Sequence, residues 1–361
     1  MPIWAAWLGG PLSRVYGAAV ARRNLAFEGG RGVMHGGVPV ISVGNLSVGG
    51  TGKTPMVMLL AQALRREGRR PAVLLRGYRA RERDGKLESD EAEEYRRALA
   101  RADAGAVEGA CEIPVIVNPE RGAALAAYLA SPEGRSAPID CAILDDGFQH
   151  RRLARDLDIV LVDATRSPFT DSLLPAGWLR EPVESLRRAL GVVVMHAESV
   201  TEEELAELET EIARSHGLPA IAVTRHVWGG LHSAQLGEHL GVGWLRGKRV
   251  VGACAIGNPG PFLCELSNHA DVRGTVVRRD HDSFGAGARR EIRELARRHK
   301  AQVIVVTEKD WSKLKHVAVS EWPCPLVRPV LEIAFDRGSA ELRAMVLGAA
   351  GAPARPTLES T

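Results

Sequence analysis

A glycine-rich turn that runs into lysine and threonine has the residue types that point most directly to chemistry. It follows the apolar run at residues 38–43 and precedes a stretch with helical periodicity. Between a strand and a helix, such a turn directs backbone N–H groups toward a phosphate chain. In this pattern Lys53 reaches the β- and γ-phosphates and the Thr54 hydroxyl binds Mg²⁺. We predict nucleotide phosphate binding by Ser47, Val48, Gly49, Gly50, Thr51, Gly52, Lys53 and Thr54.

One position of this turn departs from the usual pattern. The pattern G-x-x-x-x-G-K-[ST] has glycine where this chain has Ser47. The alternative interpretation is a glycine-rich turn that binds no ligand. Because packing alone seldom requires Gly-Lys-Thr directly after an apolar strand, we favour phosphate binding.

A pair of carboxylates marks a second chemical position. Asp145 and Asp146 directly follow the apolar run at residues 141–144. Carboxylates at the end of a strand, downstream of a phosphate-binding turn, hold Mg²⁺ directly or through water. Aspartates also cap turns and helices, so the pair alone is a weak signal. Together with Lys53 and Thr54 it predicts a magnesium site, in which either aspartate could contact the ion.

The elements that position these residues are short apolar runs that alternate with helical stretches. Continuous apolar strands of this kind are typical of a parallel sheet with both faces covered. We therefore expect an α/β fold of the P-loop NTPase type, with a mostly parallel sheet, helices on both faces and ligands at the C-terminal ends of the strands. The expected strands after the turn are residues 71–75, 114–117, 141–144, 159–162 and 191–195.

The length of 361 residues favours two domains. The composition changes near residue 226, and a new strand is expected to begin at Arg249. We predict an N-terminal amphipathic helix at residues 1–30 and a kinase core at 31–225. A smaller α/β domain is predicted at 226–345, with a flexible tail at 346–361.

The N-terminal segment combines large apolar residues with arginines and almost no acidic residues. After Trp4 and Trp7, the spacing of Leu12, Val15 and Tyr16 is helical. This composition is typical of a helix that lies in a membrane interface, and the alternative is an ordinary helix packed on the domain surface. A transmembrane helix needs a run of about 20 apolar residues, and the sequence contains no such run, so none is predicted.

Charge and cysteine content exclude other classes of function. The net charge of +3, from 47 basic and 44 acidic residues, is too small to indicate a nucleic-acid partner. The five cysteines are widely spaced, with no C-x-x-C pair, which argues against a disulfide framework or a zinc site and suits a reducing compartment.

Two longer segments resemble the signature motifs of the tetraacyldisaccharide 4′-kinases. They are N-L-S-V-G-G-T-G-K-T-P at residues 45–55, in which Ser47 is similar to the hydroxyl residue of that family, and L-D-D-G-F-Q-H at residues 144–150. The resemblance covers nearly the whole chain. Further matching motifs, in order, are R-G-Y at 76–78, L-L-P-A-G-W-L-R-E-P at 173–182, G-N-P at 257–259, D-H at 280–281 and T-E-K-D at 307–310.

The resemblance implies ATP-dependent phosphorylation of the 4′-hydroxyl of tetraacyldisaccharide 1-phosphate, in lipid A and lipopolysaccharide biosynthesis. The acceptor is an acylated glucosamine disaccharide 1-phosphate, so the enzyme is expected at the cytoplasmic face of the inner membrane, as a peripheral protein without a protein partner. The catalytic residues would be Lys53, Asp90 and His281, with Asp90 orienting His281 or taking the proton itself. Ser89 replaces the glycine that the family has before this aspartate. The alternatives are a solvated acid or helix cap for Asp90 and a surface histidine for His281.

Several further residues are each compatible with more than one role. Glu91 and Glu181 lie in matching motifs and could approach the metal or its waters. Residues 307–310 could recognise the base or form a turn with a surface Lys–Asp pair. Arg121 and Arg151 could face phosphates or solvent. The alternative function is a P-loop ATPase or GTPase switch that couples nucleotide state to a protein partner, but only a kinase explains D-H in a second domain.

Overall fold

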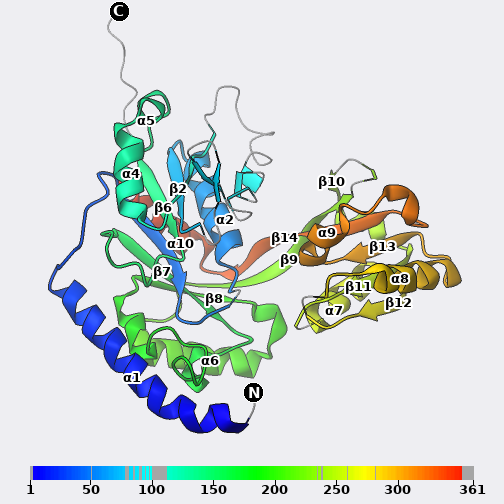
Figure 1. Cartoon of the computed structure of the whole chain (residues 1–361), viewed down its shortest axis with the longest axis horizontal. Coiled ribbons are helices and arrows are strands. Elements are labelled where there is room, and N and C mark those ends of the chain that lie inside the picture. Colours follow the sequence, from blue (N-terminus) through cyan, green and yellow to red (C-terminus); the bar gives the residue numbers. More distant parts are fainter. Residues whose placement is uncertain are drawn as a thin grey trace, which may run out of the picture. The chain divides into compact units, whose positions relative to one another are not determined.

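A computed structural model describes residues 3–49, 51–77, 81–83, 86–88, 92–93, 95–96, 98–99, 112–233, 235–236, 239–257, 259–280 and 282–351. The chain forms two compact units (Figure 1). The first consists of Met1–Arg225 with Ile333–Thr361, and the second of His226–Glu332.

The first unit is built on a parallel sheet. Its strand order is β9-β8-β7-β1-β6-β2-β5, and each adjacent pair is parallel. Residues of β1, β2, β6 and β8 are buried along the whole strand, which explains why these strands are continuous apolar runs. The strands are β1 (Val40–Asn45), β2 (Pro71–Leu75), β5 (Val115–Val117), β6 (Cys141–Asp145), β7 (Leu157–Asp163), β8 (Gly191–Met195) and β9 (Ala222–Ser233).

Helices cover both faces of this sheet. Alternate residues of a strand point to opposite faces, so Ile41 packs with Leu60 of α2 whereas Val40 packs with Leu125 of α4. A third cluster joins α6 to β7 and β8. The expected α/β fold with helices on both faces is confirmed. The helices of this unit are α1 (Ile3–Glu28), α2 (Lys53–Arg66), α4 (Arg121–Ala130), α5 (Pro132–Ser136), α6 (Glu202–His216) and α10 (Ser339–Ala349); β3 (Arg81–Arg83) and β4 (Lys86–Glu88) form a separate hairpin.

The second unit is a smaller α/β layer structure, as expected. Its strand order is β12-β11-β13-β14-β9, with β10 antiparallel to β9, and apolar clusters lie on both sides of β11 and β13. Its elements are β10 (His239–Leu240), β11 (Arg249–Cys254), α7 (Gly260–His269), β12 (Asp271–Val277), α8 (Ala286–Arg298), β13 (Val303–Val306) and α9 (Glu308–Leu314), together with the parts of β9 and of β14 (Leu326–Arg337) that lie within His226–Glu332.

The chain leaves the first unit where the composition changes, but it returns earlier than expected. The second unit ends at Glu332 rather than at residue 345. Residues 346–349 belong to α10 rather than to a tail, because Leu342 and Val346 are buried in the same core cluster as α2. Residues 352–361 lie outside the described part of the chain.

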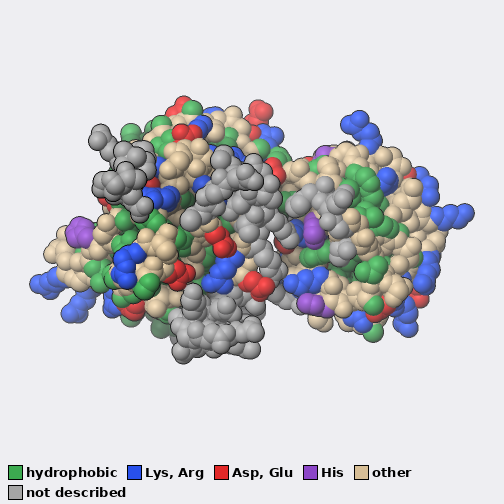
Figure 2. All heavy atoms as spheres, turned by 90° about the horizontal axis from the view of Figure 1, so that it is seen from above, with side chains coloured by type: hydrophobic (Ala, Val, Ile, Leu, Met, Phe, Trp, Pro, Cys, Tyr) green, Lys and Arg blue, Asp and Glu red, His purple; other side chains and the backbone are tan. Residues whose placement is uncertain are grey.

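None of the helices in the described part of the chain has both the length and the apolar character needed to cross a bilayer. Basic and acidic side chains lie interspersed over the face in Figure 2, in keeping with the nearly balanced charge.

Candidate active site

The glycine-rich turn lies where β1 ends and α2 begins, at the C-terminal edge of the parallel sheet. Gly49 and Gly52 have φ values of 132° and 76°, a region that residues with a Cβ rarely adopt. Gly52 directly precedes α2, so the first backbone N–H groups of this helix face the turn. Gly50 lies outside the described residues. The local geometry is that of an anion site at a helix N-terminus.

Ser47 occupies a position where this turn does not need glycine. It forms an isolated antiparallel bridge with Leu179, and the N–H of Val48 donates to the carbonyl of Trp178 at 2.8 Å. Ser47 is not among the described residues with positive φ. The start of the turn is therefore held by the segment at residues 173–181, and a side chain fits there without strain.

Lys53 extends from the start of α2 toward Asp146. Its Nζ lies 3.6 Å from Asp146 Oδ1 and 3.5 Å from the carbonyl oxygen of Gly49. Burial lowers the pKa of Lys53, and the charge of Asp146 opposes this shift. The predicted phosphate-binding lysine and one of the predicted metal-binding aspartates are thus brought together.

Asp146 has a second cationic partner that the sequence analysis missed. Arg180 donates from both terminal nitrogens to the two carboxylate oxygens, each at 2.8 Å. Burial alone would raise the pKa of Asp146, but the hydrogen bonds and charge of Arg180, with the charge of Lys53, lower it to about 2. Asp146 is ionised at neutral pH and bound to two cations. Arg180 lies in the motif at residues 173–182, but its residue type and spacing do not identify it as the partner of Asp146.

Asp145 has different surroundings from Asp146. It is buried at the end of β6, and the Tyr95 hydroxyl donates to its Oδ2 at 2.9 Å. Its Oδ1 is buried and accepts no hydrogen bond from the described residues. Burial raises the pKa of Asp145. A bound cation would satisfy this oxygen and favour the ionised form of the carboxylate, so the donor set fits Mg²⁺.

The two arginines considered as phosphate ligands have other partners. Arg121 is buried, and it donates to the carbonyl oxygen of Asp145 at 2.6 Å. Burial lowers the pKa of Arg121 to about 10. Arg151 donates to the carbonyl oxygen of Asn24 on α1 at 3.0 Å. Arg121 therefore supports the backbone of the aspartate pair, whereas Arg151 contacts the N-terminal helix.

Glu181 does not face the metal site, contrary to the expectation that it could approach the ion. It is completely buried, and its carboxylate accepts hydrogen bonds from Arg23 and Asn24 of α1 and from Arg188. Because partners surround both oxygens, the carboxylate binds α1 rather than an ion.

His150 ends the D-D-G-F-Q-H motif among positive charges. Burial and the charges of Arg121 and Arg155 lower its pKa to about 4. Between pH 6.5 and 4 the unfolded chain binds a proton that the folded chain does not, so this residue destabilises the fold as the pH falls through that range.

We expect the unfolding temperature of His150→Gln to fall less between pH 6.5 and 5 than that of the wild type. An equal fall would contradict this prediction, and His316→Gln, at an exposed position, is the control.

Motif residues of the second unit converge at the C-terminal ends of its own strands. Lys309 Nζ lies 2.8 Å from Asp280 Oδ1, and Lys313 donates to the carbonyl oxygen of Asp282 at 2.8 Å. Asp310 is fully buried and accepts from the N–H of Ala255 at 2.8 Å. The T-E-K-D motif thus caps α9 and binds Asp280 through Lys309, and Lys313 of the same helix binds the backbone of Asp282, so the residues on both sides of position 281 are held.

The predicted catalytic residues Asp90 and His281 lie outside the described residues, as does Glu91, so their roles stay predictions.

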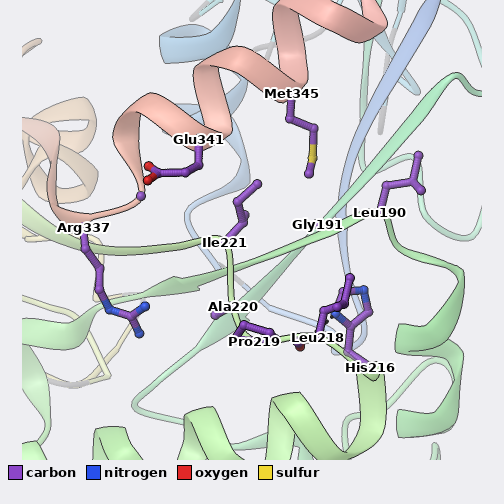
Figure 3. Close-up of a pocket in the computed structure, with 11 residues that line it drawn as sticks. Leu190, Gly191, His216, Leu218, Pro219, Ala220, Ile221, Arg337, Glu341 and Met345 are labelled. Atoms are coloured by element: carbon purple, nitrogen blue, oxygen red, sulfur yellow. Dashed lines mark hydrogen bonds between the residues drawn. The ribbon is translucent and has the colours of Figure 1, made fainter.

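A separate pocket lies at the N-terminal edge of the first sheet, away from the aspartate pair. It has a volume of about 400 Å³, and Glu341 and Met345 of α10 line it together with Ile221 (Figure 3). His216 at its rim bonds to the carbonyl oxygens of Ala189 and Leu218. The pocket contains none of the predicted site residues.

Comparison with known proteins gives one consistent family. The family model described as LpxK, tetraacyldisaccharide-1-P 4′-kinase, matches residues 5–348. Tetraacyldisaccharide 4′-kinase from Anaeromyxobacter dehalogenans (strain 2CP-C) is 37% identical over 304 residues, which cover 82% of this chain and 78% of the relative. The enzyme from Pseudomonas fluorescens (strain SBW25) is 33% identical over 317 residues, 86% of this chain and 84% of that one. The crystal structure of the "apo" form of LpxK from Aquifex aeolicus in complex with ATP superimposes with a TM-score of 0.65 at 26% identity, over 94% of this chain and 97% of that one.

Proposed function

The chain belongs to the tetraacyldisaccharide 4′-kinase family, and from this premise we propose how its residues carry out the kinase reaction of lipid A biosynthesis. The 4′-hydroxyl oxygen of tetraacyldisaccharide 1-phosphate attacks the γ-phosphorus of ATP. The bond from that phosphorus to the β,γ-bridging oxygen breaks, and ADP leaves. The contact of Lys53 with Asp146 at the phosphate-binding turn is the observation that carries the proposal.

Phosphoryl transfer depends mainly on positioning and on neutralising charge. The turn at residues 47–54 would bind the phosphates through its backbone, with Lys53 at the transferred group. Mg²⁺ would be held by Thr54 and by Asp145, whose buried Oδ1 accepts no hydrogen bond from any residue that the structure describes. The ion, when bound, neutralises the phosphate oxygens. Asp146 would keep Lys53 and Arg180 in place beside them.

The attacking hydroxyl needs a base, and we propose Asp90 and His281 for this role. A base that takes the proton in the transition state contributes about 10²–10⁴ in rate. We expect Asp90→Ala and His281→Ala each to lower kcat by about 10² or more while ATP binding is retained. The control is His316→Ala, at an exposed position of the second unit. Near-normal turnover in both variants would remove the pair from the mechanism.

The decisive assay follows labelled γ-phosphate from ATP to tetraacyldisaccharide 1-phosphate in detergent micelles. Labelled lipid that requires both substrates supports the kinase. Nucleotide hydrolysis with no labelled lipid, at any acceptor concentration, would favour the alternative of a nucleotide switch acting on a protein partner.

We further propose that α1 attaches the enzyme to the cytoplasmic face of the inner membrane, where the acylated acceptor resides. Large apolar side chains are exposed along α1: Leu12, Val15 and Leu25 are 52%, 68% and 67% exposed. Arg14 and Arg22 lie exposed among them. Apolar side chains with flanking arginines suit a bilayer surface that contains anionic lipids. Tyr16, which shares the helical spacing of Leu12 and Val15, faces the protein instead, and so does the buried Val20.

Polar substitutions at these exposed positions test the attachment. We expect Leu12→Ser with Val15→Ser to reduce co-flotation with anionic vesicles about ten-fold, because two apolar side chains no longer enter the interface. Leu218→Ser changes a leucine that is 62% exposed elsewhere in the same unit, and it should float as the wild type does. Unchanged flotation of the double variant would refute docking through these residues of α1.

A further inference from the structure

The segment at residues 173–181 lies between α1 and the phosphate-binding turn and contacts both. On one side, Val48 and Ser47 of the turn pair with Trp178 and Leu179. On the other side, the segment receives the inward side of α1. The N-terminal helix is therefore one segment away from the predicted ATP site.

Polar and small residues on the inward side of α1 make contacts that converge on this segment. Ser13 Oγ donates to the carbonyl of Leu173 at 2.8 Å and accepts from the N–H of Ala176 at 3.1 Å. Gly17 permits the close approach, since a Cβ there would lie 3.0 Å from Leu173 Cδ1. The Tyr16 hydroxyl donates to the carbonyl of Arg180 at 3.0 Å. A helix that served only to reach a membrane would not need these polar contacts.

The backbone of Arg180 is hydrogen-bonded through both its N–H and its carbonyl group. Its N–H donates to the carbonyl of Leu46 at 2.7 Å, and its carbonyl accepts from Tyr16. The next residue, Glu181, is fixed by Asn24 of α1 at 2.9 Å and by Arg188 at 2.8 Å. From this fixed backbone the Arg180 side chain reaches Asp146 with two hydrogen bonds and also donates to Asn45 Oδ1.

We infer that Tyr16, Asn24 and Glu181 are positioning residues for Arg180, so that α1 sets the affinity for ATP in addition to any contact with a membrane. The inference rests on the proposed function in so far as ATP is the ligand of the turn. Arg180 bonds to the carboxylate that also contacts Lys53, so a shift of its backbone would alter both cations that the proposed function places beside the phosphates. A displacement of the guanidinium by a fraction of about 1 Å weakens such charge-assisted, bidentate hydrogen bonds.

The test removes one hydroxyl from each of two tyrosines in the full-length protein. Tyr16→Phe deletes the bond to the Arg180 carbonyl, whereas Tyr128→Phe deletes an equivalent bond to the carbonyl of Ala137, at 3.1 Å, between α4 and the end of α5. Affinity for a non-hydrolysable ATP analogue with Mg²⁺ is measured by calorimetry in detergent, without vesicles. We expect Tyr16→Phe to weaken binding about three- to ten-fold and Tyr128→Phe to leave it unchanged, with similar losses of unfolding temperature in both.

A double-mutant cycle separates positioning from general destabilisation. On an Arg180→Ala background, Tyr16→Phe should weaken binding no further, because the side chain that it positions is absent. Equal weakening on both backgrounds, or no weakening by Tyr16→Phe, would overturn the inference. Asn24→Ala provides a second variant with the same expected pattern, whereas Glu181 is left intact because its removal would leave Arg188 as a buried charge without a carboxylate.

This binding experiment and the transfer assay fail independently. A protein that binds the analogue but labels no lipid would refute the proposed acceptor, and the cycle would still report on α1. A protein that labels lipid while Tyr16→Phe binds ATP normally would refute only the role of α1.

Discussion

Lys53→Ala is expected to lower kcat for 4′-phosphoryl transfer by about 10³ or more, since it removes the positive charge next to the transferred phosphate. Its Nζ lies 3.6 Å from Asp146 Oδ1 at the start of α2. The loss should exceed that of any other single substitution, because charge stabilisation of the transition state is the main task of a protein in this reaction.

Steady-state kinetics with labelled ATP and the lipid acceptor in micelles measure this effect. Lys315→Ala, which changes an exposed lysine of the second unit, is the control. If the alanine variant raised KM for ATP and kept kcat, Lys53 would contribute equally to ground-state and transition-state binding, and its proposed role in transfer would be refuted.

The second prediction with a large expected effect distinguishes the role of Asp145 from that of Asp146. We expect Asp145→Asn to lower kcat by about 10² and to shift the Mg²⁺ dependence to higher concentration, because it weakens the proposed direct ligand. Asp146→Asn should also lower kcat, since Arg180 and Lys53 lose their shared carboxylate, but the Mg²⁺ dependence should stay close to that of the wild type.

The measurement is kcat as a function of free Mg²⁺ for the two variants, which differ only in the position of one amide. A shift of the Mg²⁺ curve for Asp146→Asn alone would reverse the assignment. The different surroundings of the two carboxylates make this a sharp comparison: one has a buried oxygen that accepts no hydrogen bond from the described residues, and the other bonds to Arg180 through both oxygens.

Local sequence patterns predicted the elements of the first unit well. Each expected strand is a run of apolar residues, and for most of them this pattern corresponds to burial between two helix layers, whereas β5 is half-buried. The glycines of the turn likewise follow from a local requirement, the positive φ of Gly49 and Gly52.

Contacts between distant residues could not be predicted in this way. The partners Asp146 and Arg180 are separated by 34 positions, and Asn24 and Glu181 by 157. Glu181 lies in a matching motif, and its residue type alone is compatible with a metal ligand. Its contacts with α1 can be seen only in the folded structure. The return of the chain through β14 and α10 was missed for the same reason, since α10 gains its stability from packing against α2 rather than from its own sequence.

The two-sided character of α1 has a practical consequence for engineering this enzyme. Deleting the helix to obtain a form that needs no detergent would take away Tyr16 and Asn24 together with the apolar residues, and would leave the buried Glu181 with Arg188 as its remaining partner among those described here. A shortened protein that lost activity would then say nothing about membranes. Replacing the exposed Leu12, Val15 and Leu25 with polar residues keeps the inward contacts of α1. We expect such a variant to be a kinase that needs no detergent, so that its chemistry can be studied separately from membrane binding.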